Sequence, residues 1–322
     1  MADSPLKQAF LSHPRQWEQF SLVYPVISRR SRGLSVGVNL NPDTACNFDC
    51  IYCCVVRKES GGRRQETGAD KPRVELDVLT RELDAMLTLV AHGEFWRHPQ
   101  FADIPADYRR LNDIAFSGDG EPTACPLFPA AVDLVMALLE KHNFHEAKIV
   151  LITNATLLDR PQVEAALQKL EQGPHEIWAK LDAGTPEDFH RIDRTRVPFA
   201  KVLNNILECG RRRPITIQTM LLRCPPPEVP PEAPPEVPPE VCSQTEAPAS
   251  ESCFPDDAFI SAYIDRLAEL IAGGCQIQAV QLYTVARGAA EAWVSPASHE
   301  ELEGVAQRVR ERLPGVEVKA YG

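Results

Sequence analysis

The sequence lacks a long uncharged hydrophobic run, and it lacks an apolar segment after its first residues, Met1-Ala-Asp-Ser-Pro5. A membrane-spanning helix needs about 20 mostly apolar residues, and a secretory signal needs an apolar core near the amino terminus. The ten cysteines are irregularly spaced, unlike the framework of a small disulfide-bonded secreted protein. We therefore expect a cytoplasmic protein with no membrane segment, whose thiols are free or metal-bound.

An excess of positive charge is also missing, because the chain has a formal net charge of −11. Affinity for nucleic acid depends on neutralising backbone phosphates, so this balance gives no global attraction to DNA or RNA. Local basic clusters do occur, and short clusters of this kind are usually solvated surface. They are Arg29-Arg30-Ser-Arg32, Arg63-Arg64, Arg109-Arg110 and Arg211-Arg212-Arg213. We expect no DNA partner.

Three cysteines form a tight C-x3-C-x2-C array, in which Cys46, Cys50 and Cys53 follow a strand-like run. A structural zinc site or a closed cluster needs a fourth ligand, and no second C-x2-C or His pair follows downstream. Three thiolates suit three corners of a cubane iron–sulfur cluster and leave its fourth iron open. The alternatives are a partial zinc site or redox thiols. Cys54 points in a different direction from its neighbour Cys53, so we leave it out of the ligand set.

Short apolar runs alternate along the chain with amphipathic helical stretches, and at 322 residues with 44% hydrophobic content the chain can bury one large core. Six runs read as buried parallel strands: Leu34–Leu40, Asp113–Phe116, Lys148–Thr153, Ile177–Leu181, Ile215–Leu222 and Ala279–Thr284. Six stretches read as helices: Val74–Val90, Leu127–Lys141, Gln162–Leu170, Phe199–Cys209, Asp257–Ile271 and Glu300–Leu313.

This alternation predicts an α/β fold, a partial (βα)6 barrel of the TIM type, spanning residues 34–322 after an N-terminal extension at 1–33. Right-handed crossovers place all the loops that follow the strands at one end of such a barrel. We therefore expect the functional residues to gather in those loops.

A second motif, Ser117-Gly-Asp-Gly-Glu-Pro-Thr123, follows the second predicted strand. Gly118 and Gly120 allow a sharp turn and a close approach to a ligand, and Glu121 can accept hydrogen bonds from an ammonium group. The motif therefore reads as an amine-binding turn. The alternative is an ordinary tight turn between a strand and a helix.

Weaker polar signals end the later strands. Several polar side chains lie at or near the predicted strand ends, where they either bind a ribose or a carboxylate group or simply cap helices and strands. They are Thr153, Asn154, Lys180, Asp182 and Gln218. Arg287 follows the sixth strand, where it could meet an anionic group or form a surface salt bridge.

A proline-rich stretch at residues 225–255 breaks the composition, with the repeated unit Pro-Pro-Glu-Val or Pro-Pro-Glu-Ala. Such sequence favours extended polyproline II and cannot join a sheet or helix, so we expect a disordered insertion rather than a domain. Cys224, Cys242 and Cys253 flank or lie in it. A second cluster there is the less favoured reading, because the three are widely spaced.

The cysteine array, with Tyr52 directly before its third cysteine, resembles the radical S-adenosylmethionine (SAM) superfamily. The resemblance implies a partial barrel, a 4Fe–4S cluster on Cys46, Cys50 and Cys53, and SAM as cofactor. It also implies that the segment Gly118, Asp119, Gly120, Glu121 holds the methionyl amine, with Asp119 in one glycine position. In that family the reduced cluster cleaves SAM to methionine and a 5′-deoxyadenosyl radical that abstracts hydrogen, and a flavodoxin- or ferredoxin-type protein donates the electron.

Within that superfamily, Leu151-Ile-Thr-Asn-Ala-Thr-Leu-Leu158 and Lys180-Leu-Asp-Ala183 look most like proteins related to 4-demethylwyosine synthases, which act on tRNA. This chain has no cysteine before Cys46, where archaeal members carry additional cluster ligands. The acidic balance does not favour tRNA, so an RNA base, a peptide and a small molecule all stay open as substrates. The alternative function is a non-catalytic iron–sulfur or zinc protein, which would have no use for an amine-binding turn.

Overall fold

The computed structural model describes residue 6 and residues 17–28, 31–55, 74–224 and 254–322. The predicted proline-rich insertion at 225–255 lies outside these residues except for its last two positions, and so do Cys242 and Cys253.

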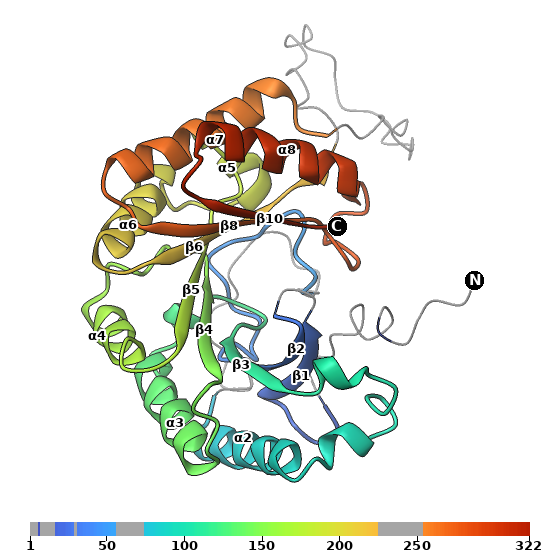
Figure 1. The fold of residues 1–322 in the computed structure, drawn as a ribbon. Helices are drawn as coiled ribbons and strands as arrows, with labels where there is room; N and C mark the ends of the chain where they lie inside the picture. The colour runs from blue at the N-terminus through green and yellow to red at the C-terminus, as the bar shows by residue number, and fades with distance from the viewer. Residues whose placement is uncertain (1–5, 7–16, 29–30, 56–73, 225–253) are drawn as a thin grey trace, which may run out of the picture.

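One curled sheet of eight strands, in the order β1-β2-β3-β4-β5-β6-β8-β10, forms the centre of the fold (Figure 1). Its strands are β1 (Val23–Ser28), β2 (Gly33–Val38), β3 (Leu111–Phe116), β4 (Lys148–Thr153), β5 (His175–Lys180), β6 (Ile215–Met220), β8 (Ile277–Tyr283) and β10 (Glu317–Tyr321). Every neighbouring pair is parallel except β1 with β2, which is antiparallel. A small antiparallel pair is formed by β7 (Leu222–Arg223) and β9 (Ser295–Pro296).

Helices lie along the outer, convex side of this sheet, and its concave side faces the centre of the molecule (Figure 1). The α-helices are α2 (Leu76–Ala91), α3 (Phe128–Lys141), α4 (Pro161–Leu170), α5 (Pro186–Asp193), α6 (Phe199–Arg212), α7 (Asp257–Ala272) and α8 (His299–Arg312). The short 3-10 turns are η1 (Phe95–Arg97), η2 (Ala106–Tyr108) and η3 (Pro122–Ala124). The predicted α/β partial barrel is confirmed, and each of the six predicted strands and helices overlaps an observed one.

The structure adds elements that the sequence did not predict. β1 lies within the predicted N-terminal extension, residues 1–33, and pairs along its whole length with β2. The buried carboxylate of Glu82 in α2 fixes the entry to β1, because it accepts hydrogen bonds from the backbone N–H groups of Ser21, Leu22 and Val23 at 2.8, 2.8 and 3.1 Å. β10, α5 and the β7–β9 pair were not predicted either.

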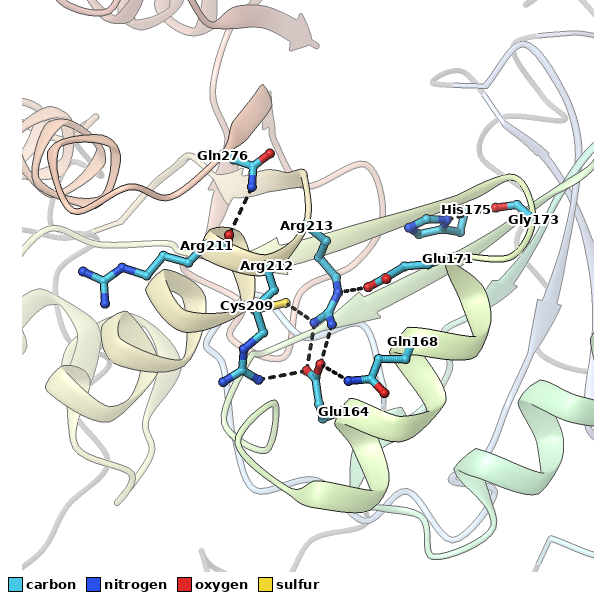
Figure 2. A network of polar contacts seen from close by, with 10 residues as sticks. All are labelled: Glu164, Gln168, Glu171, Gly173, His175, Cys209, Arg211, Arg212, Arg213 and Gln276. Atoms are coloured by element: carbon cyan, nitrogen blue, oxygen red, sulfur yellow. Dashed lines mark hydrogen bonds and ion pairs between the residues drawn. The ribbon is translucent and has the colours of Figure 1, made fainter.

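The guanidinium of Arg213, which is 3% exposed, joins α6 to α4 through polar contacts. Figure 2 shows this side chain reaching from the end of α6 to Glu164 and Glu171 at α4. Its two terminal nitrogens contact the Glu164 carboxylate at 2.9 and 2.5 Å, and its Nε donates to Glu171. Because a buried cation requires compensation, this network aligns α4 and α6 against the sheet.

Candidate functional site

The cysteine loop follows β2 and is held by hydrogen bonds to the end of α5. The backbone N–H groups of Asp49 and Ile51 donate to the carbonyls of Asp193 and Ile192 at 3.1 and 2.9 Å. The hydroxyl of Thr195 donates to the carbonyl of Asn47 at 2.8 Å. These three bonds give the loop a defined path.

The thiols of Cys46, Cys50 and Cys53 line a single cavity of about 340 Å³ on the concave side of the sheet. All eight described cysteines are free, so these three are available as thiolates. Within the described part of the chain, no three His, Cys, Asp or Glu side chains converge as ligands of one metal ion would. A cubane cluster makes no such demand, since each of its cysteines binds a different iron. Three thiols on one loop therefore fit the donor set of such a cluster.

Cys50 has a buried polar environment. Its Sγ lies 3.3 Å from Oδ1 of Asp193, which is 1% exposed. Burial, and next the charge of Asp193, raise the pKa of the Cys50 thiol, so a bound metal would be needed to hold it as a thiolate. Cys54 also borders the cavity but is exposed to solvent, and its exclusion from the ligand set stays a prediction.

The turn from Gly118 to Glu121 packs directly against the strand and loop of the cysteine array. A Cβ atom on Gly118 would lie 2.3 Å from Oδ1 of Asn39, and one on Gly120 would lie 2.0 Å from the carbonyl oxygen of Ala45. Asn39 also donates to the Asp119 carboxylate at 2.7 Å. These two glycines are required for backbone packing beside the cysteines, in addition to any contact with a ligand.

Glu121 is 2% exposed and lies on the cavity wall, where its carboxylate joins the ends of β3 and β4. Oε1 accepts from the hydroxyls of Thr123 and Thr153 at 2.5 and 2.6 Å and from the N–H of Thr123 at 3.2 Å. Oε2 accepts from the N–H of Asn154 at 2.7 Å, so this oxygen keeps room for another donor. Burial raises the pKa of Glu121, and these hydrogen bonds oppose that rise.

Thr153 and Asn154, both on the cavity wall, bond to the motifs that precede them in the chain. Besides the contacts with Glu121, the amide of Asn154 donates to Oδ1 of Asn47 in the cysteine loop at 2.7 Å. The end of β4 therefore connects the Glu121 turn to the cysteine loop, a role that sequence spacing could not reveal.

Lys180 places a positive charge on the cavity wall. Its Nζ lies 3.2 Å from the Asp182 carboxylate, donates to the Tyr283 hydroxyl at 2.6 Å, and sits 4.9 and 5.1 Å from the ring centroids of Tyr52 and Tyr283. Burial lowers the pKa of Lys180, but Asp182 and Tyr283 more than offset this and raise it. The ion pair with Asp182 therefore favours the ammonium form of Lys180.

Asp182 contacts two residues of the cavity wall, Tyr52 and Lys180. It accepts hydrogen bonds from the Tyr52 hydroxyl and, at 2.7 Å, from the N–H of Met220, and it is 1% exposed. Tyr52 borders the cavity, whereas Asp182 is not one of the described residues that line it. The structure thus brings Tyr52 and Asp182 together but makes Asp182 a support for Lys180 and Tyr52.

Gln218 and Arg287 also border the cavity. The Gln218 amide donates to Gln281 on the neighbouring strand at 2.9 Å, which holds it against the concave face, and Arg287 is exposed at the rim. Cys224 is buried away from this wall, with its sulfur 3.8 Å from a guanidinium nitrogen of Arg191.

Sequence reasoning missed the residues that hold the cysteine loop, namely Asn47, Asp193 and Thr195. Asn47 is a polar residue inside the cysteine motif, and Asp193 and Thr195 are polar residues at the end of a short helical stretch, so the sequence marks none of them as a support for the loop. Asp193 lies 143 positions after Cys50, so only the fold reveals the contact.

Comparison with protein families gives a match over residues 40–224, more than half of the chain, to the model described as the Radical SAM superfamily. A curated protein from Brachyspira hyodysenteriae, named GTPase Obg, is 24% identical over 189 residues, which are 58% of this chain and 23% of that protein. This chain thus spans about a quarter of that relative. No helix among the described residues has the length and apolar character needed to cross a membrane.

Comparison with solved structures finds three that are similar to this chain. TYW1 with a lysine–pyruvate adduct has a TM-score of 0.49 at 16% identity, covering 87% of this chain and 74% of that one. SuiB from Streptococcus suis, bound to SAM, has a TM-score of 0.49 at 11% identity, covering 91% and 52%. An archaeal TYW1 has a TM-score of 0.45 at 14% identity, covering 86% and 72%.

Proposed function

Because this chain belongs to the radical SAM superfamily, we propose that it binds a 4Fe–4S cluster through Cys46, Cys50 and Cys53 and cleaves SAM reductively. The observation that carries the proposal is the shared cavity wall, where the three thiols meet the Gly118–Glu121 turn and the Lys180 ammonium. A cluster alone would need only the thiols.

When bound, and with the cluster reduced by one electron from an external donor, these groups would supply cleavage of SAM to methionine and an adenosyl radical able to take a hydrogen atom from a substrate. The chain's own residues contribute position and shielding. Bonds from Ile192, Asp193 and Thr195 hold the cysteine loop in place, and the buried loop residues Phe48, Ile51 and Tyr52 exclude water from its inner side.

For SAM we assign complementary charges to the two ends of its methionyl group. Oε2 of Glu121 accepts from the ammonium, because among the described residues it accepts one hydrogen bond, from the N–H of Asn154, and Glu121 lies on the wall. Lys180, held as a cation by Asp182, binds the carboxylate or a ribose hydroxyl. Thr153 and Asn154 border the same region and complete the polar surface, while Asp119 and the two glycines keep the turn close to the cysteines.

We propose that the substrate reaches the concave face of the sheet and is an RNA base, a peptide or a small molecule. The second candidate function, an iron–sulfur or zinc protein without catalysis, leaves unexplained why a buried carboxylate and a half-buried ammonium share the cavity with the thiols. Buried charges of this kind are costly and occur mostly where they meet a ligand or each other.

Anaerobic reconstitution tests the assignment. We expect about four irons per chain, loss of iron in Cys46→Ala, Cys50→Ala and Cys53→Ala, and retention in the neighbouring control Cys54→Ala. The reduced wild-type protein, given SAM, is expected to release 5′-deoxyadenosine. Tight zinc binding without iron uptake, or iron lost from the Cys54 variant and kept by the Cys53 variant, would contradict the proposal.

A further inference from the structure

The side chain of Asp193, the last residue of α5, is buried against the cysteine loop. Its Oδ1 lies 3.3 Å from the Sγ of Cys50, and the residue is 1% exposed. Its carbonyl accepts from the N–H of Asp49, so the backbone and the side chain of Asp193 both contact the loop. The left-handed backbone of Arg194, with φ of 43°, ends the helix directly after it. The position of this carboxyl group beside the sulfur is therefore defined by the end of α5.

A second buried carboxyl group, that of Asp182, has different partners. It accepts hydrogen bonds from the Tyr52 hydroxyl and the N–H of Met220, and it forms an ion pair with Lys180 at 3.2 Å. Within the described part of the chain, no cation forms an ion pair with Asp193, and its side chain contacts the Cys50 thiol instead. An unpaired charge in so buried a place is costly, so the neutral acid of Asp193 is favoured, and its hydroxyl is a hydrogen-bond donor.

A hydrogen bond to a cysteine sulfur changes the energy of an iron–sulfur cluster. A thiolate bound to iron has no proton, so in such a contact the other group must be the donor. Reduction adds electron density to the cluster and its sulfurs, which strengthens the bond, and hydrogen bonds to the sulfurs are among the features that set the potential of these clusters. A donor beside the Cys50 sulfur therefore favours the reduced form.

We propose that Asp193 is a positioning residue of the cluster, whose reduction potential it raises through its contact with the Cys50 sulfur. The inference rests on the proposed function, because it requires Cys50 to be a cluster ligand. Thr195, two residues later, is also buried and also holds the loop, but its hydroxyl donates to the carbonyl of Asn47 and not to a sulfur. These two neighbouring side chains therefore separate an effect on the cluster from support of its loop.

The experiment is an anaerobic redox titration of the reconstituted protein without SAM, followed by the electron paramagnetic resonance signal of the reduced cluster. Asp193→Leu has a similar size but cannot donate. We expect it to lower the equilibrium constant for one-electron reduction about tenfold, which corresponds to a potential lower by about 59 mV. Asp193→Asn keeps a neutral donor of the same shape and is expected to titrate near the wild-type potential. Thr195→Val is the matched control, because it removes a bond to the loop without removing one to a sulfur, and it is expected to keep the wild-type potential.

Equal potentials in the wild type and Asp193→Leu would overturn the proposal. A higher potential in both Asp193 variants would also overturn it, since the carboxyl group would then act as a negative charge. An equal fall in Thr195→Val and Asp193→Leu would do the same, because loosening of the loop would explain both. If Asp193→Leu holds no iron, Asp193→Ala takes its place, and loss of iron from both would make Asp193 a structural support only. A wild-type protein that takes up no iron would instead refute the proposed function, so the two failures are distinguishable.

Discussion

The substitution Glu121→Gln tests the amine-binding role of the turn after β3. It removes the negative charge while keeping the side chain's shape, so the methionyl ammonium of SAM loses a charge-assisted hydrogen bond. Such a bond contributes about 1.5–3 kcal/mol, which is about a 10- to 150-fold loss of SAM affinity. Calorimetry with the reconstituted protein measures this directly.

The same substitution has a structural cost that must be separated from the loss of binding. The N–H groups of Thr123 and Asn154 bond to different carboxylate oxygens, so a glutamine amide leaves one of them facing an NH2 group, whichever way it is turned. An unsatisfied buried donor costs about 1–3 kcal/mol of stability. Thr123→Val supplies the control, because it removes a hydroxyl bond to Glu121 and keeps the charge. We expect this control to lose stability and to bind SAM as the wild type does.

The pH dependence gives a second readout of Glu121. Burial raises its pKa, so protonation of the free protein competes with ammonium binding above the usual range of a glutamate. SAM affinity is therefore expected to fall with decreasing pH in the wild type and to stay flatter in Glu121→Gln. If Glu121→Gln binds SAM with wild-type affinity, or if Thr123→Val loses as much affinity as Glu121→Gln, the amine-binding role is refuted.

Three further predictions concern the frame of the site. Arg213→Met leaves the half-buried Glu164 and the exposed Glu171 without their cation and is expected to lower the free energy of unfolding by about 2 kcal/mol in urea titrations, against less than about 0.5 kcal/mol for the exposed Arg212→Gln. The hydrogen bond from Arg213 lowers the pKa of Glu164. The stabilisation by this pair is therefore complete above the unfolded-state pKa and is lost as the pH falls through the lowered value. Glu164→Gln is expected to flatten the fall in unfolding free energy at acid pH, and an unchanged slope would contradict the assignment. Gly120→Ala places a Cβ 2.0 Å from a backbone carbonyl of the cysteine loop and is expected to reduce iron uptake, whereas Gly173→Ala, with open space around its Cβ, leaves it unchanged.

The parallel part of the fold was predictable because its signal is local. Parallel strands buried on both faces read as short apolar runs, and β4 was predicted with its observed ends, Lys148 and Thr153. The covering helices carry one apolar face each, and their predicted bounds differ from the observed ones by no more than three residues.

β1 and β10 carried too little of that signal. β1 contains Pro25, which weakens any strand assignment and is tolerated here because β1 pairs on one side only, with β2. Its anchor, Glu82, follows about 60 residues later in the chain. In β10 only Val318 is buried, so no apolar run marks it, and the strand is defined by its pairing with β8.

The same contrast between local signals and long-range contacts applies to the residues of the site. Residues placed by strand ends could be predicted, because in parallel strands those ends converge, and the cavity wall does unite the cysteines with Glu121 and Lys180. The support of the cysteine loop could not be predicted, because α5 has only eight residues and few apolar positions. That short helix nevertheless supplies the carbonyls and the carboxylate of Asp193 that contact the loop. Local spacing thus predicts candidate side chains for cofactor binding, whereas long-range pairing determines how firmly those side chains are held and which outer surface lies next to them.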